Sequence, residues 1–218
     1  IYAFLTSALK TTIGLLLAVY LTSNVFGQGL QRNLMFFPVL VSTIGVGLTF
    51  SALMHPTRGL FNVSLAGLGI AGPGWLVNQD LALYSVALID VWKGIGLATL
   101  IYIAGLATIS PDYYEAARID GGTRSQMFWR ITVPLVRPAT ITVMTLSLIG
   151  GLRSFDLIWS TTRGGPGFSS DVLASVIYKQ YQAGFYGLST AGNVILFLLI
   201  AIIVIPLTSY FNKRQVEQ

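Results

Sequence analysis

The fold is decided by an uncharged stretch near the end of the chain, LSTAGNVILFLLIAIIVIPLTSYF, at residues 188–211. A helix that crosses a bilayer needs about 20 mostly apolar residues, and this stretch supplies them. Four earlier runs have the same character, at residues 1–23, 34–54, 82–108 and 138–160. We therefore expect an all-α, polytopic membrane protein with five visible spans.

The composition excludes other classes of protein. Of the 218 residues, 54% are hydrophobic and 10% are charged, whereas a soluble domain has about a quarter of its residues charged. Disordered chains are polar and highly charged, so disorder is excluded as well. The net charge of +5 is scattered between apolar runs, which argues against nucleic-acid binding. The absence of cysteine from the sequence excludes disulfides and thiol catalysis.

The basic residues predict the orientation of the chain, because cytoplasmic loops are enriched in Lys and Arg. Alternating loops place residues 109–137 and the C-terminus on the basic, cytoplasmic side, and residues 55–81 and 161–187 outside. The basic residues on the cytoplasmic side are Arg32, Arg118, Arg124, Arg130, Arg137, Lys213 and Arg214, against Arg58, Arg163 and Lys179 outside.

The cytoplasmic loop carries the signals of a helix–glycine–helix elbow. Ser110 is suited to cap a first helix, which Gly121-Gly122 ends. A capping box from Thr123 to Gln126 begins a second helix, which we expect to end before Pro134.

Three apolar side chains in the second helix, Met127, Phe128 and Trp129, are expected to be exposed. Exposed apolar groups beside a membrane indicate a docking surface for a partner or lipid, and a plain solvated hairpin is the alternative.

The elbow resembles a known family. Glu115-Ala116-Ala117-x-x-x-Gly121, followed by Ile131-x-Val133-Pro134, is similar to the EAA motif of permease subunits of bacterial ATP-binding-cassette (ABC) importers. The usual ending is Ile-x-Leu-Pro, so Val133 is a mild departure. Phe155-Asp156 followed by Thr162-x-Gly164-Gly165-Pro166 is similar to the maltose-type sugar permeases, in the first of their two subunit classes.

This resemblance implies the type I ABC importer permease (MetI-like) fold, with six spans. Because the chain opens at Ile1 inside an apolar run, we expect the native protein to start earlier and to contain the first span there. The resemblance also implies a place in the bacterial inner membrane and a sugar-class solute. The implied partners are a second permease subunit, forming a heterodimer, two cytoplasmic ATPase subunits and an external solute-binding protein.

In such a permease the EAA loop supplies a coupling helix that docks on an ATPase subunit. The chain has no phosphate-binding loop of its own, so we expect ATP hydrolysis to reside in the partners and this chain to be no enzyme, with no catalytic residue and no cofactor. His55, the one histidine in the sequence, has no second ligand type nearby, and we expect no metal site. The resemblance assigns the coupling role to Tyr114, Glu115, Ala116, Ala117, Asp120 and Gly121.

Charged residues inside spans are rare and are candidates for function. Asp90 and Lys93 lie three residues apart, as do Arg153 and Asp156, so each pair shares a helix face. Such pairs neutralise each other within one helix, or they line the translocation path. Lys10 has no acidic neighbour in its span; it pairs across helices or marks the outer boundary of that span. The resemblance extends a substrate-path role to Asp90, Lys93, Gly94, Leu97, Ser147, Gly150, Gly151 and Ser154.

The outward segment at residues 161–187 begins with the turn Gly164-Gly165-Pro166-Gly167 and continues as a mildly amphipathic stretch. It has two interpretations, a flexible surface loop or a scoop that contacts a solute-binding protein, as the resemblance suggests.

Other functions stay open beside the importer. A secondary transporter driven by an ion gradient would need midplane carboxylates and inverted repeats, and neither is apparent. A membrane-embedded enzyme would need paired carboxylates or an activated nucleophile, and none stands out. Within the importer class, the solute could be an oligosaccharide, glycoside, polyol or glycerophosphodiester.

Overall fold

The computed structural model describes residues 1–23 and 26–213, and within these ranges the regular structure is entirely helical. Arg214, assigned above to the cytoplasmic side, lies outside the described residues. The helices, which include one π-helical turn, η1, are α1 (Tyr2–Thr22), α2 (Gln28–Leu40), α3 (Thr43–Leu53), α4 (Leu60–Gly67), α5 (Ala82–Leu106), α6 (Pro111–Ile119), α7 (Arg124–Met127), η1 (Phe128–Thr132), α8 (Val133–Leu135), α9 (Arg137–Leu152), α10 (Asp156–Thr161), α11 (Leu173–Gln182) and α12 (Tyr186–Lys213).

Three of these helices, α1, α5 and α12, are each long and apolar enough to cross a membrane. They coincide closely with the runs at 1–23, 82–108 and 188–211. Two bent pairs of helices pass the same test together, so the described residues hold three spans, or up to five if each bent pair is one span.

The run at 34–54 is not one straight helix. Pro38 lies near the end of α2, the chain becomes extended at Val41, and α3 leaves at 98° to α2. Proline removes a backbone hydrogen bond and favours the end of a helix. Helix α2 begins at Gln28, six residues before the apolar run that starts at residue 34.

The run at 138–160 is also broken. Helix α9 ends at Leu152, three residues connect it to α10, and Phe155 has an extended φ of −131°. Arg153 and Asp156 therefore do not share a face of one helix, and no ion pair joins them in the described part of the chain. The expected intrahelical pair between them is wrong because the helix on which it depends is interrupted.

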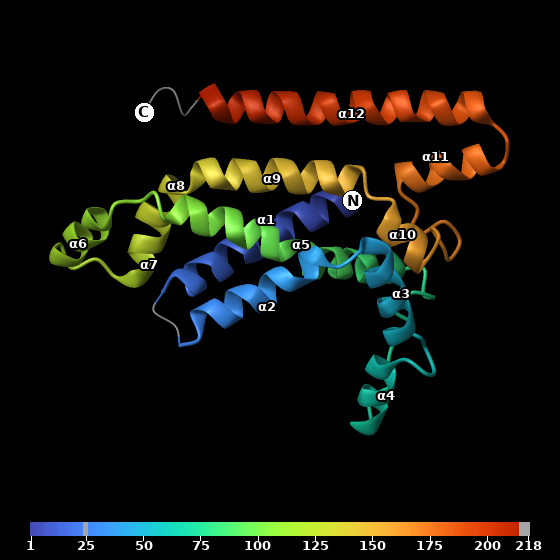
Figure 1. Cartoon of the computed structure of the whole chain (residues 1–218), viewed down its shortest axis with the longest axis horizontal. Helices are drawn as coiled ribbons and strands as arrows, with labels where there is room; N and C mark the ends of the chain where they lie inside the picture. Colours follow the sequence, from blue (N-terminus) through green and yellow to red (C-terminus); the bar gives the residue numbers. More distant parts are fainter. Residues whose placement is uncertain (24–25, 214–218) are drawn as a thin grey trace.

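The centre of the molecule is formed by α1, which packs along both α5 and α9 (Figure 1). Small residues allow the three helices to approach one another closely. Between α9 and α1, a Cβ atom at Gly151 would lie 2.7 Å from the Cα of Ala3; between α5 and α9, a Cβ atom at Gly105 would lie 2.6 Å from the Cβ of Ala139. Interfaces between membrane helices are enriched in small residues for this reason.

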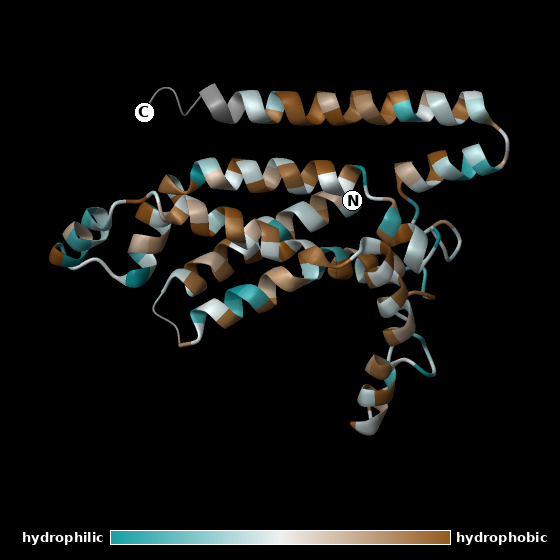
Figure 2. Ribbon diagram, in the orientation of Figure 1, coloured by the Kyte–Doolittle hydropathy of each residue, from teal (hydrophilic) through white to brown (hydrophobic). Residues whose placement is uncertain are grey.

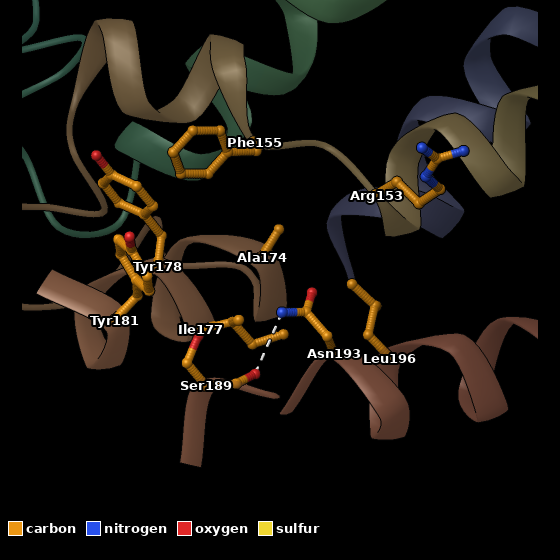
Figure 3. A pocket seen from close by; sticks show the side chains of 9 residues that line it. All are labelled: Arg153, Phe155, Ala174, Ile177, Tyr178, Tyr181, Ser189, Asn193 and Leu196. Carbon is orange, nitrogen blue, oxygen red and sulfur yellow. Dashed lines mark hydrogen bonds between the residues drawn. The ribbon is translucent and has the colours of Figure 1, made fainter. Parts of the chain in front are cut away.

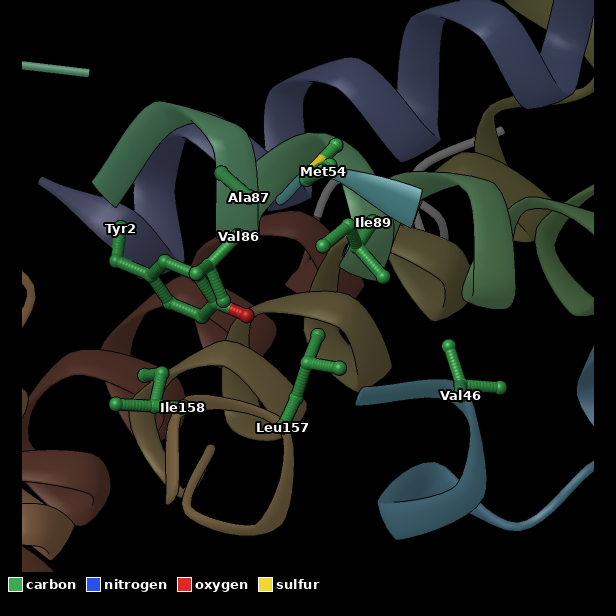
Figure 4. Close-up of a cluster of buried hydrophobic side chains, with 8 residues drawn as sticks. All are labelled: Tyr2, Val46, Met54, Val86, Ala87, Ile89, Leu157 and Ile158. Atoms are coloured by element: carbon green, nitrogen blue, oxygen red, sulfur yellow. The ribbon is translucent and has the colours of Figure 1, made fainter. Parts of the chain in front are cut away.

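A cluster of buried side chains joins α1, α5 and α10 to α3 and the residue that follows it, Met54 (Figure 4). This cluster fixes α10 beside the start of α1. Its members are Tyr2, Val46, Met54, Val86, Ala87, Ile89, Leu157 and Ile158.

Helix α12 stands apart from the rest and packs on α9 and α11 (Figure 1). Only 6% of its most apolar 18-residue stretch is buried, although the mean hydropathy of that stretch is 2.6. Figure 2 shows hydrophobic residues, in brown, along much of the helix. A helix that is apolar all round belongs in a membrane or against another subunit.

The connections gather at two opposite ends of the molecule (Figure 1). Helices α6 and α7 lie at the end where α1 is followed by α2, and α3, α4, α10 and α11 lie at the other end. This is the separation that alternating spans require, and it puts the elbow and the 161–187 segment at opposite ends.

Candidate functional site

The centre of the bundle holds an ion pair between two helices. The Nζ atom of Lys10 on α1 lies 2.7 Å from Oδ2 of Asp90 on α5, and Lys10 is only 8% exposed. Of the two interpretations left open for Asp90 and Lys93, an ion pair within one helix is therefore wrong. The error arises because spacing along one helix gives no information about the charge on a helix packed against it. Of the two roles left open for Lys10, pairing across helices is confirmed.

Gly94 explains how the lysine fits between the helices. It lies one turn after Asp90 on α5, and a Cβ atom there would lie 2.8 Å from Cε of Lys10. The missing side chain leaves room for the methylene chain of the lysine to cross the surface of α5. Gly94, to which the resemblance gave a substrate-path role, thus also makes room for the side chain of Lys10.

The break after α9 is joined to the start of α1. Ser154 Oγ donates a hydrogen bond of 3.3 Å to the hydroxyl oxygen of Tyr2, and Ser7 Oγ donates one of 3.2 Å to the carbonyl oxygen of Met144. Both bonds connect α1 to the α9 region.

A cavity of about 110 Å³ lies between α1, α5 and α9, and we call it the Lys10 cavity. It brings together four of the expected path residues, Gly94, Leu97, Ser147 and Gly150, beside Lys10 itself. Lys10 was noted in the sequence as a cation without an acidic neighbour in its span, but it was not counted among the expected path residues.

The other expected path residues have different surroundings. Asp90 reaches this region through its bond to Lys10, and Ser154 bonds Tyr2. Gly151 faces the backbone of α1, so it serves packing, and Lys93 is half-buried on α5 outside the cavity lining.

The elbow lies at the end of the molecule where α1 is followed by α2, and its local structure agrees closely with the signals in the sequence. Ser110 Oγ accepts a hydrogen bond from the backbone N–H of Asp112 at the start of α6. At the end of α6, Gly121 has φ +73°, and the backbone N–H of Gly122 donates to the carbonyl oxygen of Ala117 at 2.8 Å. These are the marks of a Schellman motif, in which the residue after the helix takes a left-handed conformation that favours glycine.

The second arm of the elbow begins with the expected capping box. The backbone N–H of Gln126 donates to Thr123 Oγ1 at 3.3 Å, and the backbone N–H of Thr123 donates to Gln126 Oε1 at 2.8 Å. The arm does not end before Pro134, however. It continues through η1 and α8 to Leu135, and Pro134 lies inside the arm, two residues after the π-helical turn.

Most of the expected coupling residues face outward. Glu115, Ala116, Asp120 and Gly121 are exposed and Ala117 is half-buried. Tyr114 turns inward instead, and its hydroxyl lies 3.0 Å from Oγ1 of Thr132 in η1, where either oxygen can donate the hydrogen bond. This contact joins the two arms of the elbow.

The apolar residues of the second arm differ from expectation. Trp129 is 65% exposed, as predicted, whereas Met127 and Phe128 are half-buried. The π-helical turn changes which side chains the arm presents, and the sequence carries no clear signal for such a turn.

The segment at residues 161–187 is a folded unit, which argues against a flexible loop. Asp171 and Lys179 form an ion pair of 2.7 Å, and the hydroxyls of Thr162 and Ser170 lie 2.7 Å apart. In the residues that the structure describes, no cluster of three or more metal-ligating side chains occurs.

Comparison with known proteins yields one family and several relatives. Residues 10–217 match the family described as binding-protein-dependent transport system inner membrane component. The trehalose/maltose transport system permease protein of Thermococcus litoralis is 35% identical over 199 residues, covering 91% of this chain and 68% of that protein. The arabinooligosaccharides transport system permease protein of Bacillus subtilis is 32% identical over 216 residues, covering 95% of this chain and 67% of that protein.

Solved structures share the fold. One is a bacterial ABC transporter involved in the import of the acidic polysaccharide alginate, with a TM-score of 0.83 at 21% identity, covering 97% of this chain and 78% of that one. Another is a bacterial alginate ABC transporter in complex with a periplasmic protein that holds an alginate pentasaccharide, with a TM-score of 0.83 at 24% identity, covering 94% of this chain and 74% of that one.

Proposed function

This chain belongs to the family of binding-protein-dependent transport system inner membrane components, and we propose that it is the permease subunit of an ATP-driven importer for a sugar-class solute. It is a multi-pass membrane protein with the all-α, MetI-like fold of type I ABC importer permeases. The sugar class is supported by relatives named for trehalose, maltose and arabinooligosaccharide transport, at 35% and 32% identity.

The Lys10 cavity is our proposal for part of the translocation path. It lies among three packed helices, and its lining combines two polar side chains, Lys10 and Ser147, with small residues and the apolar side chains Leu97, Ile101, Val143 and Leu146. The ammonium and hydroxyl groups can hydrogen-bond a solute rich in hydroxyl groups. The cavity volume of about 110 Å³ is below the roughly 300 Å³ of a small ligand pocket, so this chain supplies one side of the path. A second permease subunit, as the heterodimer partner, would supply the other.

The elbow is our proposal for the coupling site. Glu115 and Ala116 are exposed on a short helix whose angle to the second arm is fixed by Gly121 and by the capping box of Thr123. A stiff projecting knob of this kind can transmit the closure of two cytoplasmic ATPase subunits to the helices of the bundle. This exposed elbow, in a chain without a phosphate-binding loop, is the observation that carries the proposal.

The remaining partner and the orientation follow from the same proposal. If the elbow faces the cytoplasm, so does the C-terminus, and the folded segment at 161–187 faces outward. There it would meet an external solute-binding protein. A solved structure of the same fold contains a periplasmic protein loaded with a pentasaccharide, and this supports the assignment.

Reconstitution tests the proposal. The chain, its second permease and the ATPase subunits are placed in liposomes that enclose ATP, and a loaded binding protein with a radiolabelled saccharide is added outside. We expect saccharide to accumulate only with enclosed ATP, and we expect no ATP hydrolysis by this chain alone. Accumulation driven by a sodium or proton gradient without ATP would instead identify a secondary transporter.

A further inference from the structure

A pocket of about 420 Å³ opens between the α9–α10 connection, α11 and α12 (Figure 3), at the end of the molecule opposite the elbow (Figure 1). Its volume lies within the range of about 300–1,000 Å³ that is usual for ligand pockets. It shares no lining residue with the Lys10 cavity. Six of its lining residues matter here: Arg153, Phe155, Tyr178, Tyr181, Ser189 and Asn193.

One wall of the pocket belongs to a row of aromatic rings, which we call the aromatic row. The ring centroid of Phe155 lies 4.9 Å from that of Tyr178, which lies 6.3 Å from that of Tyr181, which in turn lies 5.3 Å from that of Tyr186. Trp159 stacks on Phe155 at 5.6 Å. Exposure rises along the row, from half-buried Phe155 to Tyr181 at 55% and Tyr186 at 62%.

The row leads from solvent toward the start of α1. Its inner ring, Phe155, directly follows Ser154 in the break between α9 and α10, where Ser154 bonds Tyr2 of α1. Its outer rings lie on α11 and at the start of α12, in the segment that we propose faces outward.

Polar groups stand beside the rings. The amide of Asn193 donates to the carbonyl oxygen of Ser189 at 3.2 Å, which leaves the amide oxygen of Asn193 available. Arg153 is exposed, and no hydrogen bond or ion pair engages its guanidinium among the residues that the structure describes. Figure 3 shows Asn193 between the aromatic residues and the helix end that carries Arg153.

We propose that this pocket is an outer binding subsite for an oligosaccharide on its way to the path. A sugar ring has a flat face of C–H groups, which packs on an aromatic ring, and an edge of hydroxyls, which needs donors and acceptors. A pocket with both Tyr181 and the polar pair Arg153 and Asn193 matches both features. An acyl chain would gain nothing from the guanidinium or the amide. The inference rests on the proposed function, because it deepens the same sugar assignment.

Binding to the assembled complex tests the subsite. The complex with its second permease and ATPase subunits, in lipid nanodiscs and without binding protein, is titrated by calorimetry with glucose, maltotriose, arabinotriose and an alginate trisaccharide. We expect one trisaccharide to bind more tightly than glucose. Tyr181→Ala and Tyr181→Leu should weaken it about tenfold, the change that about 1.4 kcal/mol produces. Tyr181→Phe, which keeps the ring, should bind as the wild type does.

The control is Tyr84→Ala, which removes from α5 a tyrosine of similar exposure, 50% against 55% for Tyr181. Unchanged affinity in Tyr181→Ala, an equal loss in Tyr84→Ala, or no measurable binding of any probe by the wild-type complex would overturn the subsite. ATP-driven uptake into liposomes separates the two proposals. If the wild-type complex imports a trisaccharide while Tyr181→Ala imports it with the same concentration dependence, the subsite alone fails. If no saccharide is imported, the sugar assignment fails and the subsite fails with it.

Discussion

At the scale of single residues, the ion pair between Lys10 and Asp90 is the feature with the clearest energetic consequence. The Nζ atom of Lys10 lies 2.7 Å from Oδ2 of Asp90, and the side chains of Lys10 and Asp90 are 10% and 20% exposed. Removing one member of a buried pair leaves an uncompensated charge and costs about 3–5 kcal/mol, whereas replacing both by apolar groups is often neutral.

This gives a stability prediction for four variants. We expect Lys10→Met and Asp90→Leu each to lower the thermal midpoint of the purified protein in detergent, and the double variant to recover most of the loss. Lys93→Met is the matched control, since it removes a cation from the same face of α5 without touching the pair. If Lys93→Met lowered the thermal midpoint as much as Lys10→Met, the result would favour an ion pair between Asp90 and Lys93 instead.

The same variants distinguish a structural pair from a path residue. If the Lys10 cavity lines the path, the stable double variant should still lose uptake of the saccharide, because the ammonium that faces the cavity is gone. Uptake is measured in ATP-loaded liposomes at equal protein content. Full uptake by the double variant would remove Lys10 and Asp90 from the path and leave Leu97, Ser147 and Gly150 to define it.

At the scale of elements, the elbow depends on one backbone conformation. Gly121 has φ +73° and a Cβ atom there would meet nothing within 4 Å, so the obstacle to substitution is conformational. A left-handed conformation costs an L-residue about 1–2 kcal/mol, and asparagine tolerates it better than most.

We therefore expect Gly121→Val to lower transport and substrate-stimulated ATP hydrolysis together, Gly121→Asn to retain most of both, and membrane insertion to be normal in each. Gly29→Ala is the control, because Gly29 is a helical glycine in open space. Normal transport by Gly121→Val would show that the elbow is a solvated hairpin.

The approach of α2 to α5 yields a second prediction for elements. A Cβ atom at Gly96 would overlap the carbonyl oxygen of Met35, and a backbone atom cannot move aside as a side chain can. Overpacking costs about 1–3 kcal/mol, so Gly96→Ala should lower the thermal midpoint. Gly187→Ala, with nothing near its Cβ position, should leave the midpoint unchanged or raise it slightly. A stable Gly96→Ala protein would mean that α2 is not held against α5 in the membrane.

The sequence predicted elements where the cause is local. Ser110, the Gly121 turn and the capping box at Thr123 are each decided by a few neighbouring residues, and all three are confirmed. Prediction from the sequence failed where the structure depends on contacts between residues that are far apart in the chain. The break at Phe155, the partner of Asp90 and the π-helical turn at Phe128 depend on packing that hydropathy and spacing do not record.

At the scale of the whole molecule, the long apolar helices and the two clusters of connections were predictable because they follow from bilayer thickness and from charge. The packing of α12 on α9 and α11 was not predictable, because a helix that is apolar on all sides does not indicate which helix it packs against. The proposed path lies between helices that are far apart in sequence, so the residues carried over from the resemblance included Gly151, which faces α1, and omitted Lys10.

Orientation is testable directly because the chain contains no cysteine, so the wild type is already a suitable background. Ser64 in α4 and Ser125 in α7 are both exposed and lie at opposite ends of the molecule. A membrane-impermeant maleimide should label Ser64→Cys in intact spheroplasts, and should label Ser125→Cys only after lysis. The reverse pattern would invert the proposed orientation and with it the coupling role of the elbow.

The pair of Lys10 and Asp90 also sets a problem of timing during synthesis. The two residues are 80 positions apart, so at about 5–20 residues per second the ribosome delivers the carboxylate roughly 4–16 seconds after the ammonium. Helix α1 must therefore enter the bilayer while its lysine is still alone, and translocon measurements put the penalty for such a residue at about 2.5–3.5 kcal/mol. Helix α1, whose most apolar 18-residue stretch has a mean hydropathy of 1.6 with the lysine included, has to carry that charge into the membrane until α5 arrives to neutralise it.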